Sequence, residues 1–214
     1  MIGEHIGPYR LLTSLGGAAG AVHRATGPDG RDVAIRALPA GAAPDIARMR
    51  EVRSPYVVDV LDGAAAGDLD GAGDGPDGGG YVVSRLVPGR PLADAVAERG
   101  PLAGAALHRT ALGLAKAIAA IHDAGLAHGD LHPGTVLLVD DAPVVVDFGL
   151  VPGADPADDV RGWAAVVLFA AVDPTAVPAG LRPLVEAAAS ADRAARREAA
   201  ELAAAAALLE PPPG

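Results

Sequence analysis

The chain has 214 residues, of which 50% are hydrophobic and 21% are charged, so it can bury a sizeable core and we expect it to fold on its own. Cysteine is absent, which excludes a disulfide framework and a thiolate metal site. The net charge of −10 argues against a nonspecific binder of nucleic acid or of anionic membranes, because those surfaces require basic patches.

Nothing in the sequence predicts a membrane span. The longest apolar run, Ala164 to Val172, is too short to cross a bilayer. No basic and then apolar segment opens the chain, so we expect a soluble protein in a reducing cytoplasm. The one dense basic cluster, Arg193 to Arg197, lies among alanines and acids, which favours a solvated helix face.

Short apolar runs alternate with glycine and proline in the first part of the chain, a pattern that is typical of strands. These runs are Tyr9 to Leu15, Ala21 to Ala25, Asp32 to Ala37, Tyr56 to Leu61 and Tyr81 to Val87. Gly27-Pro-Asp-Gly30 predicts a hairpin between the second and third runs. Together they predict a five-stranded antiparallel sheet, with one short helix around Asp45 to Val52 before the fourth strand.

Residues 63–80 are rich in glycine and aspartate and have almost no apolar side chains, so they predict a mobile loop. Four aspartates in this segment would be candidates for a calcium loop, but the ligand spacing of an EF-hand is missing. They are Asp68, Asp70, Asp74 and Asp77.

The hydrophobic period changes to that of helices after Pro91. The predicted helices are Leu92 to Arg99, Leu102 to Ala124, Asp158 to Val172, Leu181 to Ala189 and Ala194 to Leu209. A β-rich lobe followed by a helical lobe is α+β architecture. We therefore predict one two-lobed domain over 1–214, with a small β lobe at 1–88, a reduced helical lobe at 89–210 and a ligand cleft between them.

The most specific motif is His128-Gly-Asp-Leu-His-Pro-Gly-Thr135, which a predicted hairpin separates from Asp147-Phe-Gly149. Asp147 follows Asp130 by 17 positions, and together these motifs resemble the catalytic and metal loops of bacterial serine/threonine protein kinases. The resemblance implies that Asp130 is the base that orients an acceptor hydroxyl, with His132 in the position of the loop lysine. It also implies that Asp147 and Thr135 occupy the two metal-binding positions, where Thr135 replaces the usual asparagine.

Three motifs in the first part of the chain fit the same resemblance. Gly7 to Val22 resembles the first strand, the phosphate-covering loop and the second strand, although Leu15 falls on the first glycine unless one residue is deleted. Val33-Ala-Ile-Arg36 is similar to the Val-Ala-Ile-Lys motif, and Tyr81 to Gly89 resembles the fifth strand and hinge, with Ser84 as gatekeeper. ATP or ADP with magnesium is the implied cofactor. The implied nucleotide contacts are Gly17, Gly20, Val22, Ala34, Arg36, Arg85 and Val87.

The chain departs from the family pattern in residues on which phosphoryl transfer depends. Its single lysine is Lys116, and it has no asparagine, so Arg36 stands for the phosphate-clamping lysine. Asp45 aligns best with the glutamate that pairs with this lysine, and whether it pairs with Arg36 stays open. Gly129 replaces the arginine that contacts a phosphorylated activation loop.

The segment in the position of the family's activation segment is also shorter than the family pattern. Asp159 resembles the aspartate that binds the catalytic-loop backbone, yet it lies only ten residues after Gly149, with no Ala-Pro-Glu between them. No serine, threonine or tyrosine lies between Thr135 and Thr175. Arg196 resembles the arginine that would pair with the missing glutamate.

Two functions remain from the sequence. The first is a pseudokinase that binds nucleotide weakly and acts on another protein in regulation or scaffolding. The second is an active phosphotransferase, either a serine/threonine kinase or a small-molecule kinase, since His128 to Gly134 also resembles the loop of aminoglycoside- and choline-kinase-like enzymes. His122, His128 and His132 could form a metal cluster, but packing of His122 and His128 is the better account.

Overall fold

The computed structural model of the chain describes residues 5–16, 22–65, 79–192 and 198–209. It is an α+β protein with two compact units. Met1–Val52 with Val58–Val87 is called the β unit, and Arg53–Val57 with Pro88–Gly214 is called the helical unit. The short segment Arg53–Val57 thus belongs with the helices although parts of the β unit flank it on both sides in the sequence.

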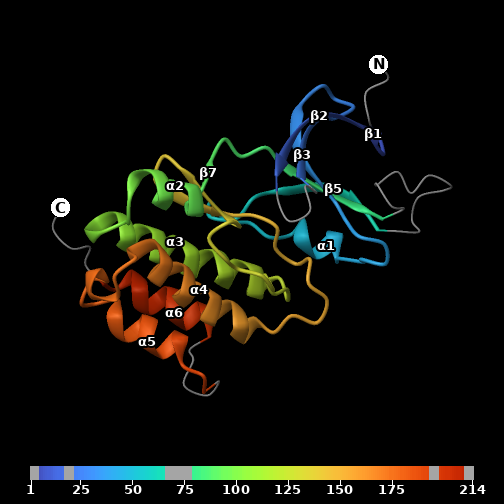
Figure 1. Ribbon diagram of the computed structural model, residues 1–214. Helices are drawn as coiled ribbons and strands as arrows, with labels where there is room; N and C mark the ends of the chain where they lie inside the picture. The colour runs from blue at the N-terminus through green and yellow to red at the C-terminus, as the bar shows by residue number, and fades with distance from the viewer. Residues whose placement is uncertain (1–4, 17–21, 66–78, 193–197, 210–214) are drawn as a thin grey trace. The chain divides into compact units, whose positions relative to one another are not determined.

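The β unit is built on a six-stranded antiparallel sheet of order β1-β2-β3-β4-β6-β5 (Figure 1). Its strands are β1 (His5–Ile6), β2 (Tyr9–Gly16), β3 (Val22–Thr26), β4 (Asp32–Ala37), β5 (Val60–Ala64) and β6 (Tyr81–Arg85). The predicted hairpin at Gly27 is confirmed, because its N–H donates to the carbonyl of Arg31 at 2.8 Å. The sequence did not predict β1, which is only two residues long.

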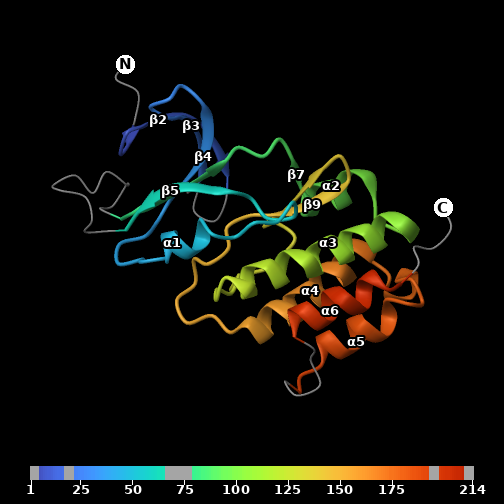
Figure 2. The same cartoon turned by 180° about the vertical axis from the view of Figure 1, so that it is seen from behind.

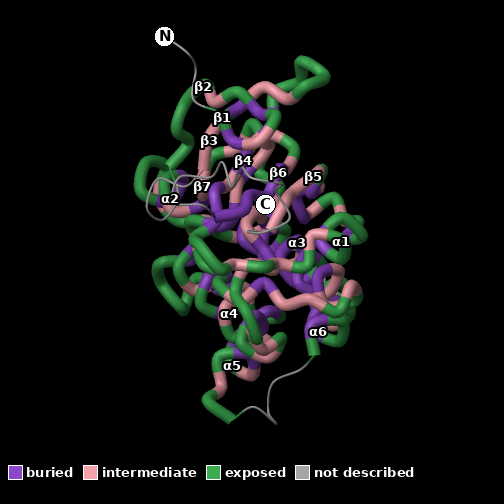
Figure 3. Tube along the Cα trace, turned by 90° about the vertical axis from the view of Figure 1, so that its right-hand side faces the viewer, coloured by how far each residue is buried: buried purple, intermediate pink, exposed green. Residues whose placement is uncertain are grey.

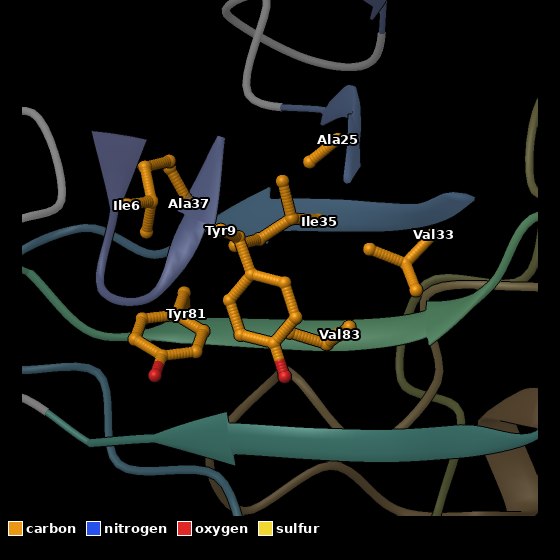
Figure 4. Packing of buried hydrophobic residues seen from close by; sticks show 8 residues of the cluster. All are labelled: Ile6, Tyr9, Ala25, Val33, Ile35, Ala37, Tyr81 and Val83. Carbon is orange, nitrogen blue, oxygen red and sulfur yellow. The ribbon is translucent and has the colours of Figure 1, made fainter. Parts of the chain in front are cut away.

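Strand alternation places the core on one face of this sheet. Val33 and Ile35 of β4 are buried there together with Tyr9 of β2 and Tyr81 of β6 (Figure 4). The rings of Tyr9 and Tyr81 meet edge to face at 5.8 Å between centroids. The hydroxyl of Tyr9 donates to Asp62 at 2.6 Å, and burial, followed by this bond, raises the pKa of Tyr9.

Two predicted boundaries in the β unit were wrong. The expected strand Tyr56 to Leu61 is displaced, since β5 begins at Val60 and continues to Ala64. Gly63 and Ala64, the first residues of the expected loop 63–80, belong to β5 instead, because Gly63 pairs with Val82 in the sheet. Residues 66–78, which include the four aspartates considered for calcium, lie outside the described residues.

The helical unit contains five α-helices, a short 3-10 turn and a three-stranded sheet among its described residues. The helices α3, α4, α5 and α6 lie side by side in both views of the ribbon (Figures 1 and 2). The elements are β7 (Arg90–Pro91), α2 (Leu92–Arg99), α3 (Gly104–Asp123), β8 (Val136–Val139), β9 (Ala142–Val145), α4 (Pro156–Ala171), η3 (Pro174–Ala176), α5 (Arg182–Ala189) and α6 (Ala199–Ala207).

The central helix of this unit is α3, whose buried residues recur at the helical period (purple in Figure 3). Leu107, Leu114 and Ile118 are fully buried. Trp163 of α4 is also fully buried, and its indole N–H donates to the carbonyl of Ala111 at 2.8 Å, which fixes α4 against α3. In the described part of the chain, no helix combines the length and apolar character that a bilayer crossing requires.

Tyr56 explains why the segment before β5 leaves the sheet. Its carbonyl accepts from the N–H of Val145 at 2.8 Å, and Val57 forms a parallel bridge with the same residue. The ammonium of Lys116 on α3 lies 5.9 Å from the centroid of its ring. Arg53–Val57 is therefore held between α3 and β9, a tertiary contact that its apolar pattern could not distinguish from strand pairing.

Candidate functional site

The loop that carries the predicted catalytic residues is organised around one buried carboxylate. Asp159 of α4 accepts from the backbone N–H of His128 at 2.7 Å and from that of Gly129 at 2.9 Å. The same carboxylate lies 2.8 Å from Nε2 of His122 on α3. With three polar partners, Asp159 can remain buried, and it fixes the backbone just before Asp130.

His128 connects this loop to the strand that precedes Asp147. Its Nδ1 accepts from the N–H of Asp130 at 3.2 Å, so its Nε2 carries the proton and donates to the carbonyl of Val146 at 3.1 Å. Burial lowers the pKa of His128, although the carboxylate of Asp159 acts in the opposite direction. The neutral imidazole is thus a structural connector, as the sequence favoured over a metal cluster.

Asp130 and His132 lie together at the exposed side of the loop. Nε2 of His132 is 3.8 Å from the Oδ2 of Asp130, with the two side chains 50% and 75% exposed. Nδ1 of His132 accepts from the N–H of Gly134 at 3.0 Å, so the proton of the neutral ring lies on the nitrogen that faces Asp130. The arrangement leaves Asp130 accessible to an acceptor hydroxyl and places a hydrogen-bond donor beside it.

Thr135, at the position of the family asparagine, is buried and uses its hydroxyl within the loop. The hydroxyl accepts from the N–H of His132 at 3.1 Å and donates to the carbonyl of His132 at 2.9 Å. Its remaining lone pair is the one part of this side chain that a cation could use. Thr135 therefore braces the turn that follows Asp130.

Asp147 has the left-handed backbone conformation, with φ of 62°, and is half-buried. Two backbone bonds hold the chain around it: Val146 N–H donates to Thr135 at 3.0 Å, and Gly149 N–H donates to the carbonyl of Ala127 at 3.2 Å. Phe148 is fully buried. Oxygen ligands of the carboxylate type are the ones magnesium prefers, so Asp147 fits one such ion while Thr135 offers little toward a second.

Three of the predicted nucleotide contacts in the β unit, Val22, Ala34 and Arg36, share the face of the sheet that is opposite the core, whereas Arg85 pairs with the core residue Val33. Val22 of β3 pairs with Arg36 of β4, and Ala34 lies two residues before Arg36 on the same face. The N–H of Arg85 donates to the backbone carbonyl of Asp59 at 2.9 Å, and the guanidinium of Arg85 forms an ion pair with the carboxylate of Asp59. Val87 follows β6 as irregular chain. Gly17 and Gly20 lie outside the described residues.

Asp45 does not lie within a helix as expected. The helix α1 (Ile46–Met49) has four residues, and Asp45 is its N-cap, accepting from the N–H of Arg48 at 3.0 Å. The guanidinium of Arg48 lies 3.2 Å from the same carboxylate. The structure thus engages Asp45 with its own helix, where a short side chain can cap but has little reach.

The shortened segment after Gly149 packs on the catalytic loop, a contact that the sequence did not reveal. A Cβ atom added to Gly129 would lie 2.7 Å from Cβ of Val151 and 2.9 Å from Cβ of Ala154. The glycine at position 129 was the one signal of this contact in the sequence, because the absence of a side chain leaves room for Val151 and Ala154. Arg196, the predicted partner of the missing glutamate, lies outside the described residues.

A cavity of about 520 Å³ lies in the helical unit away from these residues. The end of α3, the start of α4 and the start of α6 line it, with Asp123, Asp155 and Glu198 as its acidic residues. None of the predicted site residues lines it. Its lining includes His122, the partner of Asp159.

A curled antiparallel sheet, a helical unit and a loop pair of His-Gly-Asp and Asp-Phe-Gly define the protein-kinase fold. Comparison with solved structures agrees: the PknI kinase domain of Mycobacterium tuberculosis matches with a TM-score of 0.75, 21% identity and coverage of 97% of this chain and 98% of that one. A second neighbour is Rad53 1–466 in complex with AMP-PNP, at a TM-score of 0.73 and 17% identity, covering 92% of this chain and 64% of that one. At these identities the likeness shows the fold alone.

Sequence relatives give the family. The "Probable serine/threonine-protein kinase PkwA" of Thermomonospora curvata is 37% identical over 174 residues, which cover 79% of this chain and 23% of the relative. The serine/threonine-protein kinase AfsK of Streptomyces coelicolor is 37% identical over 155 residues, or 70% and 19%. No protein-family model matches the chain. The chain belongs to the bacterial serine/threonine protein kinases, and it spans less than a quarter of the length of these two relatives.

Proposed function

We propose that this chain is a kinase-like domain that binds an ATP-type nucleotide and acts in regulation or scaffolding as a pseudokinase. The observation that carries the proposal is the state of the catalytic loop. The loop has the hydrogen bonds from the backbone N–H groups of His128 and Gly129 to Asp159. However, Arg36 and Thr135 replace the lysine and the asparagine that complete the chemistry in an active kinase. A domain of this kind keeps a ligand site and loses turnover.

Nucleotide binding is supported by the sheet face that carries Val22, Ala34 and Arg36, three positions at which kinases contact ATP. Gly17, Gly20 and the main chain of Arg85 and Val87 complete the proposed nucleotide contacts. The neighbour Rad53 was solved with AMP-PNP, an ATP analogue, which favours a nucleotide of the same type here.

Impaired catalysis is supported by two replacements. A guanidinium at Arg36 is planar and longer than the lysine it replaces, so the phosphate clamp changes geometry. The hydroxyl of Thr135 is bonded to the backbone of His132 instead of standing open as a metal ligand. We propose that Asp147 holds one magnesium ion with the nucleotide and that Thr135 contributes little to it.

The proposal is tested by titrating the full chain with ATP or ADP, with and without magnesium, and following the melting temperature. A ligand that binds the native state raises it in proportion to RT ln(1 + [L]/Kd). We expect a shift at millimolar ATP with a weak magnesium dependence, and Asp147→Asn should remove that dependence.

Asp141→Asn is the matched control, because Asp141 has the same φ of 62° in the exposed turn between β8 and β9, and asparagine tolerates this conformation. It should leave the titration unchanged. No shift at millimolar nucleotide under either condition would reduce the chain to a purely structural module.

A second candidate function is transfer of phosphate to a small acceptor, with Asp130 as base and His132 in place of lysine. The proximity of Nε2 of His132 to Asp130 at 3.8 Å favours it, since an acceptor hydroxyl there would meet both a base and a donor. Consumption of ATP that requires a small alcohol and is lost in Asp130→Ala would support this candidate. We propose a cytoplasmic location and an unidentified protein partner for either function.

A further inference from the structure

We infer that residues 149–159 form a strap that holds the catalytic loop in one fixed conformation, and that this arrangement requires glycine at position 129. The inference concerns the regulation of the proposed nucleotide site. Its consequence for function therefore rests on the proposed nucleotide binding. Its structural part stands on contacts inside the helical unit.

The two ends of the strap are hydrogen-bonded to the same short stretch of loop. At one end, the N–H of Gly149 donates to the carbonyls of Ala127 and His128 at 3.2 and 3.3 Å. At the other end, Asp159 accepts from the N–H groups of His128 and Gly129. Residues 127–129 are therefore bound from both sides by a segment of about ten residues.

The middle of the strap fills the space that a side chain at position 129 would occupy. The Cβ atom of Val151 would be 2.7 Å from a Cβ on Gly129, and that of Ala154 would be 2.9 Å away. These are Cβ atoms next to the backbone, so they cannot move aside as the end of a flexible side chain could. The φ of Gly129 is also +87°, which favours glycine.

The strap contains its own restraints. Its Asp155 caps α4 by accepting from the N–H of Ala157 at 2.9 Å, and Pro156 begins the helix with a fixed φ. Between Gly149 and this cap, five residues leave little freedom. The strap also lacks any hydroxyl side chain, since residues 136–174 hold no serine, threonine or tyrosine. A catalytic loop held in this way has the same conformation with and without its ligand.

Hydrogen exchange of the full chain tests the inference, with Gly129→Ala as the variant. Gly153→Ala is the matched control, because Gly153 also has positive φ (+67°) but nothing lies within 4 Å of an added Cβ. Both variants place alanine at a positive φ, and only the first also puts a Cβ atom against the strap.

We expect the amides of His128, Gly129 and Gly149 to be protected in the wild type without nucleotide. Gly129→Ala should speed the exchange of residues 149–155 roughly tenfold or more relative to Gly153→Ala. Replacing Val151 and Ala154 by glycine in the Gly129→Ala background should restore protection of the loop amides, because it removes both facing Cβ atoms. This rescue variant also separates a specific collision from a general failure to fold.

Two outcomes would overturn the inference. One is wild-type exchange of residues 149–155 at the rate of an unstructured peptide, with protection that appears only after ATP is added. The other is equal exchange in Gly129→Ala and Gly153→Ala. If ATP produced no shift in the melting temperature, the result would contradict the proposed nucleotide binding but not the strap. The hydrogen-exchange measurement would still test whether the strap holds the loop.

Discussion

Asp159 shows at the residue scale how much of the catalytic loop depends on one side chain. Replacing it by alanine leaves the backbone N–H groups of His128 and Gly129 without their acceptor. Each buried donor that loses its partner costs about 1–3 kcal/mol. We therefore expect Asp159→Ala to lower the free energy of unfolding by roughly 2–5 kcal/mol in urea denaturation.

Asp158→Ala is the control for this substitution, since Asp158 is exposed in the same first turn of α4. It should cost at most about 1 kcal/mol through the lost interaction with the helix dipole. Equal losses in the two variants would mean that the contacts of Asp159 with the loop contribute nothing measurable.

His128 gives the molecule a pH dependence whose sign follows from its burial. Burial lowers the pKa of His128, so the unfolded chain binds this proton more tightly than the folded one. Stability from the neutral imidazole is fully present above about pH 6.5 and is lost as the pH falls through that value toward the lowered pKa. His128→Asn should therefore lose less stability than the wild type between pH 7.5 and 5.5 in denaturation curves.

Burial lowers the pKa of His108 on α3 as well, and this histidine contributes with the same sign. His108→Asn should remove a separate part of the pH dependence, and the double variant should remove more than either single one. A His128→Asn curve parallel to that of the wild type would contradict the assignment.

At the scale of elements, Gly113 marks where α3 meets its neighbours. A Cβ on Gly113 would lie 2.6 Å from Pro143 of β9 and 3.0 Å from the ring of Tyr56. Alanine is favoured over glycine within a helix by about 1 kcal/mol, whereas overpacking costs about 1–3 kcal/mol. The cost of overpacking should exceed the gain in helix propensity. We therefore expect Gly113→Ala to destabilise the protein by up to about 2 kcal/mol in urea denaturation.

The control is Gly162 of α4, another glycine within a helix. Its nearest neighbour to an added Cβ is the carbonyl of Leu131 at 3.1 Å, so a small displacement relieves the contact. Gly162→Ala should cost less than Gly113→Ala. A stabilising Gly113→Ala would show that helix propensity outweighs packing at this position.

The elements that the sequence predicted well are those whose pattern is local. The helix Leu92 to Arg99 was predicted with its observed bounds, and the strand Asp32 to Ala37 likewise, because apolar periodicity and turn residues delimit both. The strand expected at Tyr56 was wrong because its partner, β9, is distant in the sequence. The same limit hid the packing of Val151 on Gly129, since no spacing reveals which side chains meet across a loop.

The resemblance selects the residues of the candidate site from the sequence, and their catalytic and binding roles stay predictions. Spacing brought out Asp130, Asp147 and Asp159, and the structure binds Asp159 to the loop as the resemblance implied. The bonds of the Thr135 hydroxyl could not be foreseen, because a threonine at a loop position is compatible with a metal ligand and with a turn brace. Tertiary geometry decides between such roles.

At the scale of the whole molecule, the decisive question is whether point changes alone separate this chain from an active kinase. Arg36→Lys with Thr135→Asn supplies the usual phosphate clamp and a second metal ligand. We predict that the double variant still phosphorylates no peptide. From Gly149 to Asp159 the chain spans at most about 35 Å fully extended, and its last part is already α4. That length leaves no folded ledge for a peptide, and positioning supplies most of this catalysis.

A radiolabel assay on a panel of basic protein substrates measures the result, with Asp130→Ala as the background. Autophosphorylation or transfer to a small acceptor would be compatible with the prediction, because neither reaction needs the ledge. Peptide labelling by the double variant would show that the short segment is no obstacle. Labelling of substrate proteins by the wild type, abolished in Asp130→Ala, would go further: Arg36 would then be a working substitute for lysine, and the pseudokinase proposal would fail.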